Sequence, residues 1–306
     1  MIQKFYSNGK LLLTGEYVVL DGVEALAIPT RYGQSLSIEP FEIGKIVWES
    51  LDEKGEVWFK ARFSLNEIVR PQIPGEHTNN EFKNRLFQIL RAAKKLNPEF
   101  LNTNTGYRIT TKLDFPRDWG LGSSSTLINN IANWAKVDAF KLSAKTFKGS
   151  GYDIAAAQHN NPILYFILKG EPFSKEIDIS WRFTDQLFFV HLNKKQNSRA
   201  GIEQYHSKPK KNTKLISEIS QLTSKIINCT TLLDFESLIT EHEEIISKII
   251  EQDSVKKLFF QDYSGSIKSL GAWGGDFILV TGDEIGMDYF RKKGYETIIP
   301  FNEMVK

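Results

Sequence analysis

The sequence from residue 114 to residue 126 reads Asp114-Phe115-Pro116-Arg117-Asp118-Trp119-Gly120-Leu121-Gly122-Ser123-Ser124-Ser125-Thr126. Gly120 and Gly122 allow the backbone to turn tightly, and the serine run supplies hydroxyl groups where a helix would begin. A helix N-terminus presents N–H donors and a partial positive charge, so this stretch suits a bound phosphate group. The residues alone leave open a plainer alternative, a glycine turn followed by a serine helix cap.

The flanking residues predict a strand before this stretch and a helix after it. Residues 107–113 alternate Tyr, Ile, Thr and Leu with Arg, Thr and Lys, which is typical of a half-buried strand. Residues 123–137 carry apolar side chains at helical spacing. The order strand, glycine loop, helix is the order that a phosphate-binding loop requires.

The rest of the chain mixes strands and helices, which predicts an α+β fold. Strands are expected at 25–30, 34–41, 162–168, 183–192 and 277–281, with a hairpin formed by 46–50 and 57–65 around an Asp-Glu-Lys-Gly turn. Helices are expected at 81–96, 139–148, 213–228 and 232–252. The glycine, proline and charges of 169–176 are typical of a linker, and the chain is expected to divide into domains 1–176 and 177–306.

Three further places carry candidate functional residues. Lys10 and Glu16 are polar residues within the otherwise apolar stretch 10–22, and Asp153 follows the flexible Gly149-Ser150-Gly151 turn. A second glycine stretch, 271–276, reads Gly-Ala-Trp-Gly-Gly-Asp and precedes a strand. Taken alone, Lys10 could also be a solvated strand-end lysine, and Asp153 could cap the next turn.

Composition excludes several classes of protein. The chain has 306 residues, which exceeds the length that a single hydrophobic core usually supports. Its net charge of +2 gives no reason to expect nucleic acid or a membrane surface as a partner. The single cysteine, Cys229, excludes an internal disulfide framework, and the five histidines show no metal-binding spacing. No run approaches the roughly 20 apolar residues of a membrane span. We therefore expect a cytoplasmic protein.

Three stretches together resemble the signatures of the GHMP kinases, the family of galactose, homoserine, mevalonate and phosphomevalonate kinases. They are 10–22, Gly120-Leu121-Gly122-Ser123-Ser124 and 271–276, in the family's order and approximate spacing. The resemblance spans nearly the whole chain. It implies an N-terminal domain like domain 2 of ribosomal protein S5, a ferredoxin-like C-terminal domain, and ATP with Mg²⁺ as cofactors.

The resemblance also implies roles for single residues. Asp153 matches the catalytic aspartate, and Lys10 matches the lysine paired with it. The ATP phosphates would be bound by Trp119, Gly120, Leu121, Gly122, Ser123, Ser124 and Ser125, and Ser124 would also bind the metal. Substrate contacts are expected from Glu16, Lys194, Ser198, Arg199, Gly274 and Gly275, although the basic loop 193–199 could equally be solvated surface.

Two details point to the substrate, and two depart from the family. Gly15-Glu16-Tyr17 resembles the first motif of phosphomevalonate kinases, because mevalonate kinases commonly have histidine at the position of Tyr17. Asp276 resembles the aspartate that follows the glycines of the third motif in phosphomevalonate kinases. Mevalonate kinase has a metal-binding glutamate on the helix before its catalytic aspartate, and residues 140–145 contain no carboxylate. Trp273 stands where the family usually has glycine, and we expect it to narrow the cleft.

These observations predict an ATP-dependent kinase acting on phosphomevalonate or mevalonate. The expected partner is a small molecule with a hydroxyl or phosphate acceptor, and a homodimer is left open. The first alternative is a kinase of another alcohol or sugar, of the homoserine or galactose type. The second is a catalytically weak nucleotide or metabolite sensor on the same fold, which the missing glutamate favours.

Overall fold

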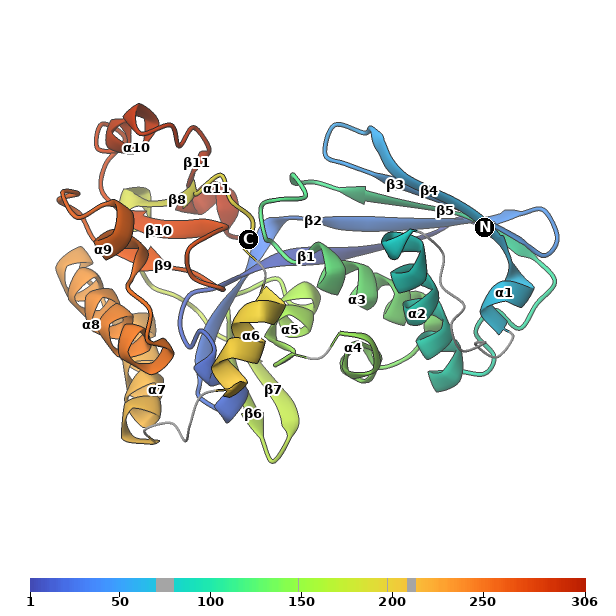
Figure 1. Ribbon diagram of the computed structural model, residues 1–306, viewed down its shortest axis with the longest axis horizontal. Coiled ribbons are helices and arrows are strands. Elements are labelled where there is room, and N and C mark those ends of the chain that lie inside the picture. Colours follow the sequence, from blue (N-terminus) through green and yellow to red (C-terminus); the bar gives the residue numbers. More distant parts are fainter. Residues whose placement is uncertain (70–79, 148, 197, 208–212) are drawn as a thin grey trace. The chain divides into compact units, whose positions relative to one another are not determined.

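The computed structural model describes residues 1–69, 80–147, 149–196, 198–207 and 213–306 (Figure 1). Internal packing divides the chain into two compact units. Unit 1 comprises residues 1–9, 32–117 and 122–158, and unit 2 comprises residues 10–31, 118–121 and 159–306. This division does not test the expected boundary after Glu176, which stays a prediction.

Unit 1 is a sheet covered by helices. Its sheet has the order β4-β3-β5-β2, and β1 also pairs with β2. The strands are β1 (Gln3–Leu12), β2 (Ala25–Phe41), β3 (Lys45–Leu51), β4 (Val57–Ser64) and β5 (Gly106–Leu113), of which β1 and β2 continue into unit 2. The helices are α1 (Leu65–Val69), α2 (Glu81–Leu96), α3 (Ser123–Ala135), α4 (Ala139–Thr146) and α5 (Tyr152–Gln158).

The core of unit 1 lies between that sheet and α2, α3 and α4. Trp48 and Ile109 of the sheet pack in one cluster with Leu90 of α2 and Ile131 of α3. Helix α2 starts at Asn80, whose side chain accepts a hydrogen bond from the Lys83 N–H at 3.0 Å. The helix at 81–96, the hairpin of β3 and β4, and the strand before the glycine loop are all confirmed.

Unit 2 contains a second sheet with the order β11-β8-β10-β9 and a hairpin that extends β2. The first part of β2 pairs with β6 (Ile163–Leu168), and β6 pairs with β7 (Glu171–Glu176). The second sheet is formed by β8 (Leu187–His191), β9 (Ile267–Ser269), β10 (Phe277–Thr281) and β11 (Ile298–Pro300). Two short 3₁₀ helices are η1 (Val18–Asp21) and η2 (Thr184–Gln186).

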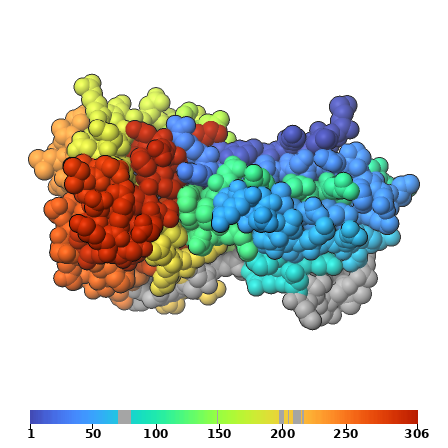
Figure 2. Space-filling view, turned by 90° about the horizontal axis from the view of Figure 1, so that it is seen from above, coloured from blue at the N-terminus to red at the C-terminus, as the bar shows by residue number. Residues whose placement is uncertain are grey.

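The helices of unit 2 are α6 (Ser198–Ser207), α7 (Thr213–Asn228), α8 (Leu232–Ile250), α9 (Val255–Phe259), α10 (Asp288–Lys292) and α11 (Phe301–Met304). Helices α7 and α8 pack against each other, and α8 also contacts β9. In Figure 2 most of the residues from α8 onward form one orange and red surface. The apolar stripe expected at 232–252 is core, since Phe235, Ile239 and Ile246 are buried.

The linker expected at 169–176 is wrong. Lys169 and Gly170 form a tight turn with φ values of 52° and 84°, and β7 then pairs with β6 along its whole length. Pro172 and the charged residues misled the prediction, because edge strands accept both proline and charge. Similarly, the basic loop expected at 193–199 ends earlier, because α6 begins at Ser198.

Among the described residues, no helix is both long and apolar enough to cross a lipid bilayer.

Candidate functional site

Helix α3 of unit 1 begins at the end of the predicted phosphate loop. Gly122 precedes it with a φ of 89°, a conformation that favours glycine. The Ser125 hydroxyl donates to the Gly122 carbonyl at 2.9 Å, whereas Ser124 is exposed. Gly122 has no side chain to cap the first turn, so the first N–H groups of α3 suit an anion. The exposed Ser124 hydroxyl at this end fits the predicted role of a metal ligand.

A buried polar network holds α3 in place within unit 1. The Asn129 amide donates to the Ser7 hydroxyl at 2.9 Å, and the Ser7 hydroxyl donates to the Asn130 side-chain oxygen at 2.8 Å. The Asn130 amide donates to the Gln34 carbonyl at 2.8 Å. Buried polar groups satisfied in this way favour one arrangement of the backbone. The network therefore fixes α3 against β1 and β2.

Asp153 lies in the first turn of α5 and is half-buried. Helix α5 packs against α3, and the Gln158 amide donates to the Asn129 side-chain oxygen at 2.9 Å. Unit 1 therefore joins the helix of Ser124 to the helix of Asp153. Helix α4, between them in the chain, has no carboxylate of its own. Its N-cap residue Asp138 accepts a hydrogen bond from the Lys141 N–H at 2.9 Å.

Lys10 and the first half of the glycine loop come together in unit 2. The Lys10 N–H donates to the Leu121 carbonyl at 3.0 Å, and its Nζ donates to the Gly120 carbonyl at 2.9 Å. Leu121 is fully buried, and the Trp119 ring packs edge-on against Phe277 at 5.4 Å between centroids. Lys10 and Asp153 belong to different units, so their pairing stays a prediction.

The second glycine stretch, 271–276 in unit 2, packs against the residues after β8. Gly274 has a φ of 88°, and a Cβ at Gly275 would lie 2.8 Å from the Lys194 carbonyl oxygen. This close approach requires glycine at position 275. Lys194 itself has an exposed side chain. The side chains of Ser198 and Arg199 lie outside the described residues, so their substrate contacts stay predictions.

Asp276, which the predicted site residues did not include, meets the phosphate loop. A Cβ at Gly120 would lie 2.2 Å from the Asp276 Cγ, so the carboxylate packs directly against this glycine. Its Oδ1 accepts a hydrogen bond from the Gln196 N–H at 3.1 Å. Burial raises the pKa of Asp276, and the nearby charge of Lys10 opposes that rise. An aspartate directly after two glycines was the signal in the sequence.

Glu16 is part of a fully buried charge cluster in unit 2. Its carboxylate pairs with the Lys268 ammonium, which also donates to Glu243 Oε1 at 2.9 Å. The Ser269 hydroxyl donates to Glu243 Oε2 at 2.7 Å. Glu16 was expected to contact the substrate, but its exposed fraction is 0%. Its described contacts link the first motif to β9 and α8, and a contact with the substrate stays a prediction.

His242 of α8 completes this cluster as a neutral ring. Its Nε2 accepts a hydrogen bond from the Gly15 N–H at 3.1 Å, which places the proton on Nδ1. Burial and the charge of Lys268 hold the pKa of His242 well below its ordinary value. Glu16, His242 and Glu243 could together ligate a metal, but the Lys268 ammonium already binds both carboxylates. We assign no metal to this cluster.

Glu16 makes stability depend on pH. Two carboxylates share one ammonium, and burial raises the pKa of Glu16 from 4.5 to about 7. At Glu16 the folded chain therefore binds more protons than the unfolded chain between these values, so the contribution of Glu16 to stability falls as the pH rises through this window. We expect the wild type to lose on the order of 2 kcal/mol more than Glu16→Gln between pH 5 and pH 8. Urea unfolding at several pH values measures this, and parallel curves would contradict it.

Trp273 belongs to the core of unit 2. It is 1% exposed and packs in a cluster with Val18, Tyr205 and Ile246. Its Nε1 has no hydrogen-bond partner in the part of the chain that the structure describes. The indole therefore packs the glycine stretch 271–276 against α8 and η1. Narrowing of a substrate cleft by Trp273 stays a prediction.

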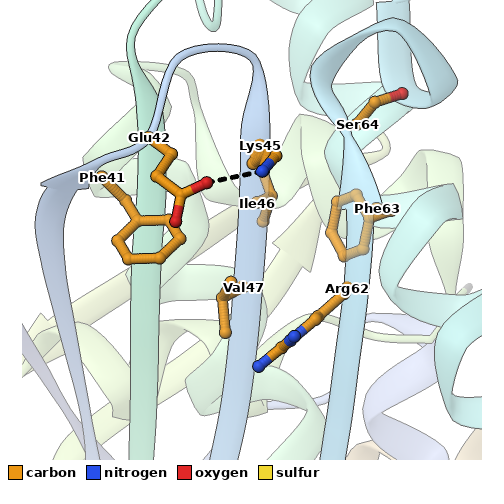
Figure 3. A pocket seen from close by; sticks show the side chains of 8 residues that line it. All are labelled: Phe41, Glu42, Lys45, Ile46, Val47, Arg62, Phe63 and Ser64. Carbon is orange, nitrogen blue, oxygen red and sulfur yellow. Dashed lines mark hydrogen bonds and ion pairs between the residues drawn. The ribbon is translucent and has the colours of Figure 1, made fainter.

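A pocket on unit 1 is lined by none of the predicted site residues. It has a volume of about 350 Å³ and lies on β2, β3 and β4, with Arg62 and Phe63 in its wall (Figure 3). Glu42 and Lys45 at its rim form an ion pair with each other. These two charges compensate each other, and we assign the pocket no function.

Comparisons with known proteins identify the fold. Neither a protein-family model nor a curated protein matches the sequence. Among solved structures, the mevalonate kinase of Methanococcus jannaschii has a TM-score of 0.72 and 17% identity, covering 98% of this chain and 97% of its own.

Two further structures agree with this similarity. Streptococcus pneumoniae phosphomevalonate kinase, in complex with phosphomevalonate and AMPPNP, has a TM-score of 0.66 and 17% identity, covering 95% of each chain. Lactococcus lactis galactokinase, complexed with galactose, has a TM-score of 0.65 and 14% identity, covering 100% of this chain and 93% of its own. The predicted α+β class is confirmed, and the chain has the two-sheet fold of the GHMP kinases over its full length.

Proposed function

We propose that the protein is an ATP- and Mg²⁺-dependent small-molecule kinase that phosphorylates phosphomevalonate or mevalonate. One observation carries this proposal. On a GHMP kinase fold, a glycine turn precedes α3, and Ser124 is exposed in the first turn of that helix. Lys10 bonded to the same loop and Asp153 on the helix packed against α3 add to it. Phosphoryl transfer requires positioning and charge neutralisation, and these groups can supply both.

The residues divide the work of the reaction as follows. The N–H groups at the start of α3 bind the ATP phosphates, with Gly120 and Gly122 letting the backbone approach them. Lys10 stabilises the negative charge that develops on the transferred group. Asp153 accepts the proton of the acceptor hydroxyl late in the reaction, because a carboxylate is a weak base toward an alcohol.

The metal would be held by few protein groups. Ser124 fits a Mg²⁺ ligand because its hydroxyl is exposed at a helix N-terminus, and Mg²⁺ commonly keeps several of its waters. When bound, the ion neutralises the phosphate oxygens. No carboxylate on α4 is available to add to Ser124. We therefore expect weak metal affinity in the absence of nucleotide.

The acceptor phosphate, where there is one, requires cations. Lys194 has an exposed side chain, and its backbone carbonyl lies against Gly275. We propose that Lys194, Ser198 and Arg199 bind this phosphate, with Gly274 and Gly275 allowing the close approach. Phosphomevalonate carries such a phosphate and mevalonate does not. The proposal therefore favours phosphomevalonate.

A panel of acceptors tests this function. ADP release is measured with MgATP and mevalonate, phosphomevalonate, homoserine or simple sugars, against a reaction without acceptor. We expect acceptor-dependent ADP release with phosphomevalonate or mevalonate. Release only with homoserine or a sugar would replace the substrate and keep the reaction class.

A nucleotide or metabolite sensor is the second candidate, and the absence of a carboxylate from α4 is the observation that favours it. Such a protein would bind MgATP in equilibrium titrations and release no acceptor-dependent ADP in the panel. The combination of binding without turnover would replace the kinase proposal.

A further inference from the structure

Asp276 is held in an uncommon backbone conformation. Its φ is 53°, in the left-handed region, which residues other than glycine seldom adopt. Its N–H donates to the Lys194 carbonyl at 2.7 Å, and its carbonyl accepts from the Leu192 N–H at 2.8 Å. Two hydrogen bonds to the residues after β8 therefore hold this conformation against its strain.

The carboxylate of Asp276 is also oriented. Its Oδ1 accepts the Gln196 N–H, and the Gln196 side chain is itself held by a 2.8 Å hydrogen bond to the Trp273 carbonyl. On the other side the carboxylate packs against the Cα of Gly120. The Gly120 carbonyl is the acceptor for Lys10 Nζ. Asp276 and Lys10 thus meet the same residue of the phosphate loop.

Three positively charged or titratable groups face this carboxylate. Lys10 of β1, Lys195 after β8 and His191 at the end of β8 each lower the pKa of Asp276, and Lys10 does so most. Electrostatic attraction is mutual, so a charged Asp276 must favour the ammonium form of Lys10. Among the charged groups of the described residues, Lys10 has the largest effect on the pKa of Asp276.

We propose that Asp276 is a positioning residue that keeps Lys10 protonated and directed along the phosphate loop. The carboxylate supplies the charge, and the Gly120 carbonyl supplies the direction. The proposal rests on the proposed kinase function, because only there does the placement of the Lys10 ammonium matter for a rate. In this proposal Lys10 is influenced by the second glycine stretch, 271–276, whereas the family resemblance implies a pairing of Lys10 with Asp153.

The protonation of Lys10 tests this proposal without any enzyme assay. Competitive acetylation of the whole protein at several pH values, read by mass spectrometry, gives the pKa of the Lys10 amine. Asp276→Asn keeps the size of the side chain and an acceptor for Gln196 but removes the charge. We expect the pKa of Lys10 to fall by about one unit in this variant. Asp185→Asn, an exposed aspartate of unit 2, should leave it unchanged.

Kinetics with the best acceptor supply the second readout. We expect Asp276→Asn to lower kcat about 10- to 100-fold with little change in the KM for ATP. The alkaline limb of the pH profile should move down by the same amount as the pKa of Lys10. If Asp276→Asn does not fold, as judged by circular dichroism, Asp276→Ser provides the same neutral change with a smaller side chain.

One result would overturn the proposal: an unchanged pKa of Lys10 in Asp276→Asn would show that Asp276 does not act on this lysine, whatever the rate. If the same variant also requires more Mg²⁺ than the wild type, Asp276 is a metal ligand instead. If no acceptor supports turnover in the wild type, the kinase function fails while the acetylation experiment still decides the role of Asp276.

Discussion

Replacing Asp153 with asparagine is expected to lower kcat about a thousandfold while leaving the affinity for MgATP within a few-fold of the wild type. Removal of a general base commonly costs between about 10² and 10⁴ in rate. Asp153 lies at the start of α5 and outside the α3 turn that is proposed to bind phosphate, so nucleotide binding should survive. Steady-state kinetics and equilibrium titration with a nonhydrolysable ATP analogue measure the two effects.

The control for this variant is Asp178→Asn, because Asp178 is exposed and the same change of charge is made there. It should retain the wild-type rate. A normal rate in Asp153→Asn would remove Asp153 from the chemistry. A parallel loss of nucleotide affinity would show that the substitution disturbs α3 through its packing with α5.

Replacing Lys268 with methionine is expected to have the largest effect on stability. The ammonium is fully buried and pairs with Glu16 and Glu243, so its removal leaves two buried carboxylates without their counter-charge. Breaking a buried ion pair in this way costs about 3 to 5 kcal/mol of unfolding free energy. Urea denaturation followed by circular dichroism gives this quantity.

Two comparisons show whether charge is the cause. Lys257→Met removes a lysine of the exposed pair with Asp253 and should change stability little. The triple variant Glu16→Gln, Glu243→Gln, Lys268→Met removes the unpaired charges together and should recover part of the loss. If the triple variant is as unstable as Lys268→Met, the loss comes from packing and not from uncompensated charge.

Local elements were largely predictable from the sequence. Helix α2 could be predicted because its apolar residues repeat at helical spacing, and the structure adds that Asn80 caps it. The strand before the glycine loop alternates buried and exposed side chains along β5, as expected. These features depend on neighbours within a few residues, which is the range that a sequence pattern describes.

The buried charge cluster was not predictable. Glu16 and Lys268 lie 252 residues apart, and lysine is among the residue types least often fully buried. The local sequence indicated this cluster only through Lys268 itself, a lysine within the short strand β9 that precedes the glycine stretch 271–276. Such a pairing depends on tertiary packing, and no periodicity carries it.

The approach of Asp276 to Gly120 shows the same limit. The glycines of both stretches indicated that a backbone or ligand comes close, but they did not indicate what comes close. In the structure one of these neighbours is a side chain of the chain itself, so Gly120 is required by Asp276 as well as by its own φ of 68°. A glycine motif therefore indicates that some group packs closely against the backbone, and that group can be a side chain of the same protein as well as a ligand.

The most direct test of the central proposal is phosphorus NMR of a reaction containing the protein, MgATP and phosphomevalonate or mevalonate. We predict that the γ-phosphorus resonance of ATP decreases while ADP appears. With phosphomevalonate a new diphosphate resonance should grow in, and with mevalonate a new phosphate monoester resonance, neither of them without acceptor. ATP left intact with both acceptors, or converted only to ADP and inorganic phosphate, would contradict the proposed phosphoryl transfer.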